Sequence, residues 1–542
     1  MERTKIKCNR LISETVSLPY TAAVGEAFEI VRRKLRRIVQ VNNDEISFSV
    51  YRRSVDARRK DDIRFVYTVL VESGIGFNVD KTRLAKEGFR IDNAEEISFE
   101  FGTEKSLHRP IVVGCGPAGM FAALMLAEQG YRPILIERGE KLEDRIASVD
   151  SFFSTGILNT ESNVMFGAGG AGTFSDGKLV TRINDPLCKY VINRLLDFGA
   201  PHEISYMAKP HIGTDLLQGV VTNLLSKVIE YGGDIYYNCL LKSISENDDG
   251  SVTAQTSLGD ICGSCIILAI GHSARDTYSY LNDNGYSMIA KPFSVGVRIE
   301  HLREDIERGL YGERAGDPLL GAAEYALSDT KNGRGVYTFC MCPGGEVIAA
   351  SSEEGGLVVN GMSRHARGGR NSNSAVAVSI RPQDYDGTPM GAVEYQRDLE
   401  RKAFTLGGGN FTAPIELLGD FLNGRSTSLR SPSRIMPTYT RGSVNVCDIS
   451  EVFPIYVNEE LRHGFKSFAK KLPGFDAPDA VMTAVESRTS APIRILRDEC
   501  GIAYGKERIY PCGEGAGYAG GITSAAVDGI RTALAVMKRF AP

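Results

Sequence analysis

The segment IVVGCGPAGMFAALMLAEQGYRPILIERG, residues 111–139, decides the fold. An apolar run, IVV, leads into three glycines with G-x-G-x-x-G spacing, namely Gly114, Gly116 and Gly119. An apolar stretch of helical length follows, and a second apolar run, PILI, ends just before Glu137. Strand, glycine-rich turn, helix and strand in this order make a βαβ unit. The segment therefore predicts an α/β domain with a parallel sheet.

Each part of this unit suits the binding of a dinucleotide. Gly114 permits a tight turn, Gly116 lets the backbone approach a pyrophosphate, and Gly119 lets the helix pack closely. The N-terminus of the helix presents oriented amides to the phosphates. Glu137 lies 23 positions after Gly114 and can accept hydrogen bonds from ribose hydroxyls.

A second match to the same spacing, Gly167, Gly169 and Gly172, lacks a preceding strand pattern and is followed by TFSDGKLVTR instead of an apolar helix. The spacing from Gly172 to Lys178 approaches that of a phosphate loop, but Leu179 stands where Ser or Thr would bind magnesium. A kinase or ATPase is therefore excluded. We expect the amides of this segment to line a bound cofactor.

A third match, Gly515, Gly517 and Gly520, follows the strand-like RIYPC and opens a helical pattern near the C-terminus. No second strand or ribose-binding acid follows it in the sequence. It is therefore expected to contact a cofactor that is bound at the first motif.

Composition excludes several classes of protein. The 542 residues predict two to four domains. Charged residues at 24% and hydrophobic residues at 42% argue against disorder, collagen and coiled coil, and the net charge of −4 gives no global reason to expect nucleic acid. The start, MERTKIKCNR, lacks the apolar segment of a signal peptide and the eleven cysteines are an odd number, so we expect a reducing cytoplasm and no membrane association.

Residues 1–105 predict a small α+β domain. An amphipathic helix is expected near residues 21–40 and strands at 46–52 and 63–72. Residues 1–60 carry 14 basic and 7 acidic side chains. A solvated basic face on a packed helix is the simpler interpretation, and an anionic partner such as RNA stays open as the alternative.

The rest of the chain divides into three parts. Residues 106–290 form the first part of the nucleotide-binding domain, with a helix at 214–230 and a buried strand in CIILAIG, 265–271. Residues 291–475 are rich in Gly and Arg and lack βαβ order, which predicts an inserted substrate or cap domain. Residues 476–542 return to the strand-then-helix order of the nucleotide-binding domain.

On these motifs the chain resembles the FAD-binding proteins of glutathione-reductase-like fold, in the branch with one Rossmann-like nucleotide-binding domain and an inserted substrate domain. VVGCGPAG with Glu137 and Arg138 is similar to the motif that binds the ADP part of FAD, and CIILAIG is similar to a later strand that ends in glycine. CGEGAGYAGGI is similar to the C-terminal motif, in which an acidic residue, here Glu514, meets the ribityl or pyrophosphate part.

Further segments, such as FGAGGAGTFSDGKLVTR and NGMSRHARGGRNSNSA, are similar to bacterial FAD-dependent or NAD(FAD)-utilizing dehydrogenases. The resemblance implies FAD as cofactor, with NAD(P)H as a candidate transient electron donor. Together with the glycine motifs it assigns the candidate cofactor-binding residues, which are Gly114, Gly116, Pro117, Ala118, Gly119, Glu137, Arg138, Gly169, Gly170, Gly172, Thr173, Ser175, Asp176, Lys178, Gly271, Gly513, Glu514, Gly520, Gly521 and Ile522.

Three residues are candidates for catalysis. His272 follows Gly271 directly and can serve as an acid or a base. Glu486 and Arg488 come shortly before the C-terminal motif in sequence. Arginines suit carboxylate or phosphate groups, so a small anionic substrate is a hypothesis carried by Arg488, Arg494, Arg364, Arg367 and Arg370.

The cysteines depart from the pattern of disulfide reductases, which place a redox pair after the first nucleotide motif. Cys262 and Cys265 enter a strand, where an offset of three points side chains to opposite faces. If their segment is extended, Cys340 and Cys342 share a face, but their Cα separation would be close to the ~7 Å limit for a disulfide. Packing roles are expected for both pairs. No cysteines and histidines have zinc-binding spacing, so no metal is predicted.

We therefore expect a FAD-dependent oxidoreductase that passes hydride through the flavin to or from a small molecule. Two alternatives remain open. One is an RNA-associated flavoprotein that docks through the basic N-terminal domain, and the other is a non-catalytic FAD-binding sensor.

Overall fold

A computed structural model describes residues 5–39, 45–92, 97–105, 108–331, 333–425 and 434–542. By their internal contacts the residues group into two units. The first comprises residues 1–98 with 201–210 and 307–323, and the second comprises the remainder of the chain.

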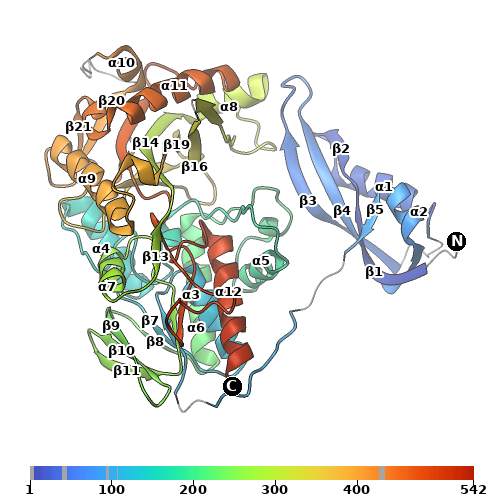
Figure 1. The fold of residues 1–542 in the computed structure, drawn as a ribbon. Coiled ribbons are helices and arrows are strands. Elements are labelled where there is room, and N and C mark those ends of the chain that lie inside the picture. Colours follow the sequence, from blue (N-terminus) through green and yellow to red (C-terminus); the bar gives the residue numbers. More distant parts are fainter. Residues whose placement is uncertain (1–4, 40–44, 93–96, 106–107, 332, 426–433) are drawn as a thin grey trace. The chain divides into compact units, whose positions relative to one another are not determined.

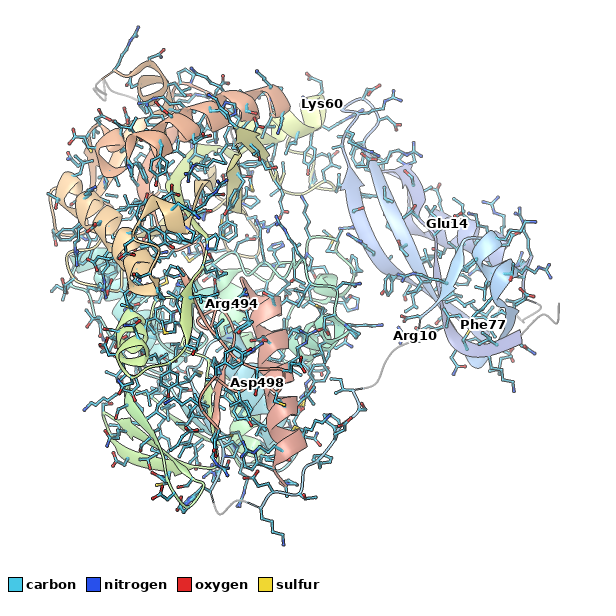
Figure 2. All side chains as sticks on the ribbon, in the orientation of Figure 1. Arg10, Glu14, Lys60, Phe77, Arg494 and Asp498 are labelled. Carbon is cyan, nitrogen blue, oxygen red and sulfur yellow. The ribbon has the colours of Figure 1, made fainter. Side chains whose placement is uncertain are left out.

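The first unit is built on an antiparallel sheet of order β2-β4-β1-β5, with β3 also paired to β4. Helices α1 and α2 pack on this sheet (Figure 1). Its core includes Val31 of α1 and Phe77 of β4, which is labelled in Figure 2. The elements are β1 Lys5–Ser13, β2 Val16–Pro19, α1 Val24–Leu35, β3 Ile46–Asp56, β4 Arg64–Asp80, α2 Lys81–Lys86 and β5 Phe89–Ile91. The predicted helix and both predicted strands are confirmed.

The second unit contains a five-stranded parallel sheet of order β24-β12-β6-β7-β8. Its strands are β6 Ile111–Val113, β7 Ile134–Ile136, β8 Asp234–Tyr236, β12 Ile266–Leu268 and β24 Ile509–Pro511. Helix α3, Pro117–Glu128, joins β6 to the parallel strand β7, which confirms the predicted βαβ unit and the α/β class.

Helices and a small antiparallel sheet flank the parallel sheet (Figure 1). Helix α12, Ile522–Arg539, and helix α6, Thr214–Glu230, both pack on α3. A Cβ on Gly529 of α12 would lie 2.1 Å from the carbonyl oxygen of Ala118 in α3. Helices α12 and α3 can therefore pack this closely only because residue 529 is a glycine. The small sheet is β9 Leu241–Glu246, β10 Val252–Thr256 and β11 Gly259–Gly263, and it shares a buried core with the parallel sheet and α7, Arg275–Asp283. Two further helices are α4 Leu142–Thr155 and α5 Leu187–Asp197.

A seven-stranded sheet of order β15-β16-β19-β14-β22-β20-β21 forms the other part of this unit. All its pairs are antiparallel except β20 with β21. The strands are β14 Phe293–Leu302, β15 Ser328–Lys331, β16 Arg334–Cys342, β19 Asn371–Ile380, β20 Ala413–Leu417, β21 Val444–Val446 and β22 Val481–Glu486. The neighbouring helices are α8 Arg303–Tyr311, α9 Pro389–Gly407, α10 Leu418–Asn423 and α11 Ile455–Lys471.

This sheet extends past residue 475, the boundary expected from sequence, because β22 is buried and pairs with β14. Two short antiparallel pairs complete the unit, β13 Met288–Ala290 with β23 Ile493–Ile495 and β17 Glu346–Ala349 with β18 Val359–Met362. The chain re-enters the parallel sheet at β24.

Candidate functional site

A cavity of about 340 Å³ lies where β6, β7 and β12 end and α12 begins. Ligands of open α/β sheets bind at the carboxyl ends of the strands, so the position is the expected one. Residues of all three glycine motifs line the cavity. Of the residues predicted from sequence, those on its wall are Gly114, Gly116, Pro117, Ala118, Glu137, Arg138, Gly170, Gly172, Ser175, Asp176, Lys178, Gly271, Glu514, Gly520, Gly521 and Ile522.

The four other predicted residues, Gly119, Gly169, Thr173 and Gly513, are not on this wall, but each is the sequence neighbour of a residue that is. A Cβ on Gly119 would lie 1.8 Å from the Gly114 carbonyl oxygen, so α3 approaches the turn closely. A Cβ on Gly169 would lie 2.1 Å from Oγ1 of the buried Thr173. Gly513 has φ +74 and lies two residues after the end of β24. The glycine character of Gly119, Gly169 and Gly513 keeps the backbone in place beside the cavity.

The first and second glycine motifs form a backbone cradle. Gly116 is the N-cap of α3, whose first turn faces this region with Pro at N1. Gly170 has φ +64, and a Cβ there would lie 2.8 Å from the Gly116 Cα. Free amides at a helix N-terminus and bare backbone on both sides suit the phosphates of a dinucleotide.

Glu137 connects three loops through backbone amides. Its Oε2 accepts a hydrogen bond from Cys115 N at 2.7 Å, and its Oε1 accepts from Gly139 N and Gly167 N, each at 2.9 Å. A carboxylate oxygen can accept more than one hydrogen bond, so Glu137 keeps capacity for a ribose hydroxyl. Sequence reasoning assigned the ribose contact and missed the three amides.

Arg145 on α4 is a further organising residue that sequence reasoning missed. Its side chain is completely buried and donates to the carbonyls of Asn163, Val164, Gly167 and Ala168, at 2.6–3.3 Å. Burial lowers its pKa to about 10 although the nearby Glu137 opposes the shift. Arg145 therefore holds the backbone that carries the second glycine motif.

The end of the second motif is tied to the seven-stranded-sheet region by ion pairs. Asp176 is buried and accepts from Arg367 Nε at 3.0 Å and Nη2 at 2.5 Å. Arg367 also donates to Glu324 Oε1 at 2.5 Å. Lys178 Nζ lies 3.7 Å from Asp176 Oδ2 and donates to the Met341 carbonyl. The guanidinium of Arg367 is thus engaged by carboxylates.

The third motif places the beginning of α12 at the cavity. Gly521 is its N-cap with φ +141, and the side-chain positions of Gly520 and Gly521 open into free space. Glu514 lines the same cavity, and burial raises its pKa to about 7 although Lys291 opposes the shift.

His272 lines the cavity, with its Nδ1 2.8 Å from Ser273 Oγ. Burial and the positive charges of Arg488 and Arg275 lower its pKa to about 3. The imidazole is therefore uncharged around neutral pH, and a group with so low a pKa is a weak general base there.

Glu486 and Arg488 differ in their position. Glu486 is buried behind the wall, with Oε2 2.8 Å from Arg298 Nε, and burial raises its pKa to about 8. Arg488 lines the cavity, but Nε and Nη2 donate to Glu400 at 3.1 and 2.9 Å and Nη1 donates to Ser352 Oγ at 2.5 Å. Arg488 is therefore bound within the protein.

The other arginines proposed for an anionic substrate do not converge on the cavity. Arg494, labelled in Figure 2, donates to the Gly517 carbonyl at 3.1 and 3.3 Å. Arg370 donates to the Arg434 carbonyl at 2.9 Å, and Arg364 is exposed. Among the five arginines, Arg488 alone is on the cavity wall.

Several wall residues were not singled out as cavity residues by the sequence. Phe339, Cys340, Asn360 and Thr489 line the cavity next to Lys178 and Arg488. They come from different strands and loops, and only the fold brings them together.

Within the described parts of the chain, no group of His, Cys, Asp and Glu is arranged to hold a metal ion. The described helices also include none that is both long and apolar enough to cross a membrane.

Three family profiles match the chain. Residues 109–170 match a FAD binding domain, and residues 292–489 match the family described as FAD-dependent protein, C-terminal domain-like. Residues 14–72 match a domain of unknown function. FAD is therefore the cofactor of the second unit, and the cradle of Gly116 and Gly170 fits its pyrophosphate.

Distant similarity extends to solved structures, and two of the three described below contain FAD. CtdE in complex with FAD is 12% identical, with 80% of this chain and 84% of that chain covered and a TM-score of 0.33. The tetracycline destructase Tet(51) is 11% identical, with coverage of 78% and 79% and a TM-score of 0.30. The halogenase PltM in complex with phloroglucinol and FAD is 13% identical, with coverage of 79% and 67% and a TM-score of 0.34.

A protein of Clostridium beijerinckii, described as uncharacterized, is 44% identical over 527 residues, which span 96% of this chain and 97% of the relative. This similarity includes the FAD-binding segment, the FAD-dependent C-terminal-like domain and the N-terminal unit alike. The chain belongs to the same family of FAD-dependent flavoproteins as this clostridial protein.

Proposed function

We propose that this protein is a FAD-dependent oxidoreductase that transfers hydride to or from a small molecule, with NAD(P)H as a transient electron donor. The observation that carries the proposal is the composition of one cavity wall. All three glycine motifs line it, and so do residues of the segment 292–489 that no glycine motif explains. A cofactor held by the motifs would therefore lie against a separate surface that can receive a substrate.

In this proposal FAD binds in the arrangement of the glutathione-reductase type. The amides at the start of α3 and the bare backbone of Gly116 and Gly170 hold the pyrophosphate, and Glu137 accepts from a ribose hydroxyl. Glu514 faces the ribityl part. Bound flavin supplies two-electron redox chemistry.

The start of α12 stabilises the reduced ring. Gly521 and Ile522 lie at the positive end of this eighteen-residue helix and line the cavity. Oriented amides at that end favour negative charge, and the N1 and C2-carbonyl side of the ring gains such charge on reduction. We therefore place that edge of the ring at these two amides.

The substrate end lies beside Phe339, Cys340 and Asn360. Phe339 is 37% exposed and Val180, also on the wall, is 55% exposed, so this end combines apolar side chains that solvent reaches with one amide and one thiol. This lining suits a small molecule with an apolar body and a few polar groups. Arg488 positions the wall by its hydrogen bonds to Glu400 and Ser352.

The experiment is an anaerobic absorption spectrum of the purified protein before and after addition of NADH or NADPH. Flavin bands that bleach with one of the two nucleotides support the proposal. Bands that persist with both would overturn the link to NAD(P)H, and a screen of small-molecule donors would then test the oxidoreductase assignment. A colourless protein that fails to take up FAD would overturn the whole proposal.

A further inference from the structure

Cys340 and Cys342 lie in an irregular part of β16. Phe339 pairs with Ala375 and Cys342 pairs with Asn373, so two residues of β16, Cys340 and Met341, oppose one residue of β19. Cys340 has φ +42, in the left-handed region that non-glycine residues rarely adopt. The segment is therefore not extended, and the Cα separation that opposed a disulfide in the sequence-based interpretation does not apply to it.

Two cationic side chains hold this unusual backbone. Arg298 is completely buried, and its Nη1 and Nη2 donate to the Cys340 carbonyl at 2.8 and 3.0 Å. Lys178 Nζ donates to the carbonyl of the next residue, Met341. Strained backbone persists where several contacts determine it, and such positions concentrate at functional sites.

The two thiols differ in their position relative to the cavity. Cys340 lines the cavity, and Cys342 is fully buried with its Sγ 3.3 Å from the Cys340 carbonyl oxygen. The other closely spaced pair differs, since Cys262 is exposed, Cys265 is buried, and neither lines the cavity.

The charges around the pair favour one thiolate and one thiol. The hydrogen bond from Cys342 and the positive charges of Arg298 and Lys178 lower the pKa of Cys340 to about 6, against the opposing effects of burial and Asp176. Glu486 also interacts with Cys340. The hydrogen bond to Cys340, burial and the charge of the Cys340 thiolate raise the pKa of Cys342. A thiolate beside a protonated partner thiol is the ionisation state that a dithiol needs to react.

We propose that Cys340 and Cys342 form a redox-active dithiol that exchanges two electrons with the flavin of this cavity. On oxidation, the Cys340 thiolate and the Cys342 thiol release one proton and two electrons, which pass to the flavin, and one S–S bond forms between the two sulfurs. On reduction, the same two electrons and proton return and the S–S bond breaks. The electron exchange rests on the proposed function, because it requires FAD beside Cys340.

The first experiment counts electrons. The holoprotein is oxidised with diamide, freed of the reagent and titrated anaerobically with dithionite. We expect the wild type to take up four electrons per FAD, two for the flavin and two for the disulfide, and Cys340→Ser and Cys342→Ser to take up two. Cys262→Ser is the matched control and should keep the four-electron uptake. Two electrons in the wild type would overturn the proposal.

The second experiment does not depend on flavin. Cysteine alkylation by iodoacetamide is followed by peptide mass spectrometry as a function of pH, in reduced protein with and without FAD. We expect Cys340 to react with a midpoint near pH 6, and this midpoint to rise in Cys342→Ala. A midpoint close to the ordinary thiol value of about 8.5 would overturn the proposal. Failure of the NAD(P)H test alone leaves both readouts intact, so the two proposals fail separately.

Discussion

Glu400 on α9 forms a bidentate ion pair with Arg275 on α7. Arg275 Nη2 lies 2.8 Å from Oε1 and Nη1 lies 2.8 Å from Oε2, and each side chain is 1% exposed. Arg488, on the cavity wall, donates to the same carboxylate. One buried carboxylate therefore joins a helix beside the parallel sheet, a helix beside the seven-stranded sheet and the wall of the cofactor cavity.

Glu400→Gln should destabilise the protein strongly. The substitution removes the charge that compensates two buried guanidinium groups, and breaking a buried pair in this way costs about 3–5 kcal/mol. Urea unfolding at pH 7 measures the effect. Glu394→Gln is the control. It removes a half-exposed carboxylate that pairs with Arg397 and Arg401, and we expect it to lower the free energy of unfolding by less than about 1 kcal/mol. Equal losses in the two variants would contradict the assignment.

The carboxylate of Glu400 should also make the free energy of unfolding depend on pH in the acidic range. Arg275 and Arg488 hold the pKa of Glu400 well below its ordinary range. A carboxyl with a lowered folded-state pKa contributes stability above its unfolded-state value of about 4.3 and loses it as the pH falls through the folded-state value. We expect the free-energy difference between wild type and Glu400→Gln to be constant from pH 7 to pH 5 and to shrink below about pH 4. A difference that stays constant down to pH 3 would refute this prediction.

Gly170→Ala should weaken FAD binding. The new methyl group would lie 2.8 Å from the Gly116 Cα, and the backbone has φ +64, so the cradle must open. We expect the FAD dissociation constant to rise at least about tenfold, or about 1.4 kcal/mol. Fluorescence titration of flavin-free protein measures it. Gly130→Ala carries similar backbone strain, at φ +86, with nothing near its side-chain position, and should bind FAD normally.

Local spacing explains which features could be predicted from sequence. The βαβ unit and the three glycine motifs depend on residues within about thirty positions of one another, and the structure brings all three motifs to one cavity. Arg145 could not be found in this way, because an arginine in an amphipathic helix looks exposed until the loop that covers it is known. The five arginines that the sequence suggested for an anionic substrate do not lie together in the structure. Arg367, for example, pairs with Asp176, which is 191 positions away in sequence.

Gly521→Val should displace the flavin. The residue has φ +141, which a β-branched side chain adopts only with strain, and it caps the helix whose first amides line the cavity. We expect FAD affinity to fall at least about tenfold. Gly505→Val is the matched control, since Gly505 has φ +75, open space around it and no place on the cavity wall. Unchanged flavin content in Gly521→Val would refute the placement of α12 at the ring.

Glu514→Gln should stabilise flavin-free protein in a pH-dependent way. Burial raises the pKa of Glu514 to about 7, so ionisation of this carboxyl destabilises the folded state above its unfolded-state value of about 4.3. The penalty grows as the pH rises to about 7 and is complete above it, and glutamine removes it. We expect the free energy of unfolding to rise by about 1–3 kcal/mol at pH 8 and to stay nearly unchanged at pH 4.

Urea unfolding of flavin-free wild type, Glu514→Gln and Glu507→Gln at both pH values tests this prediction. Glu507 is exposed, and its substitution should change stability by less than about 0.5 kcal/mol at either pH. A stabilisation by Glu514→Gln that is equal at pH 4 and pH 8 would show that the gain comes from packing. The predicted growth with pH would instead show that Glu514 is kept in the cavity at a cost to stability, which is the behaviour of a group retained for its contact with a ligand.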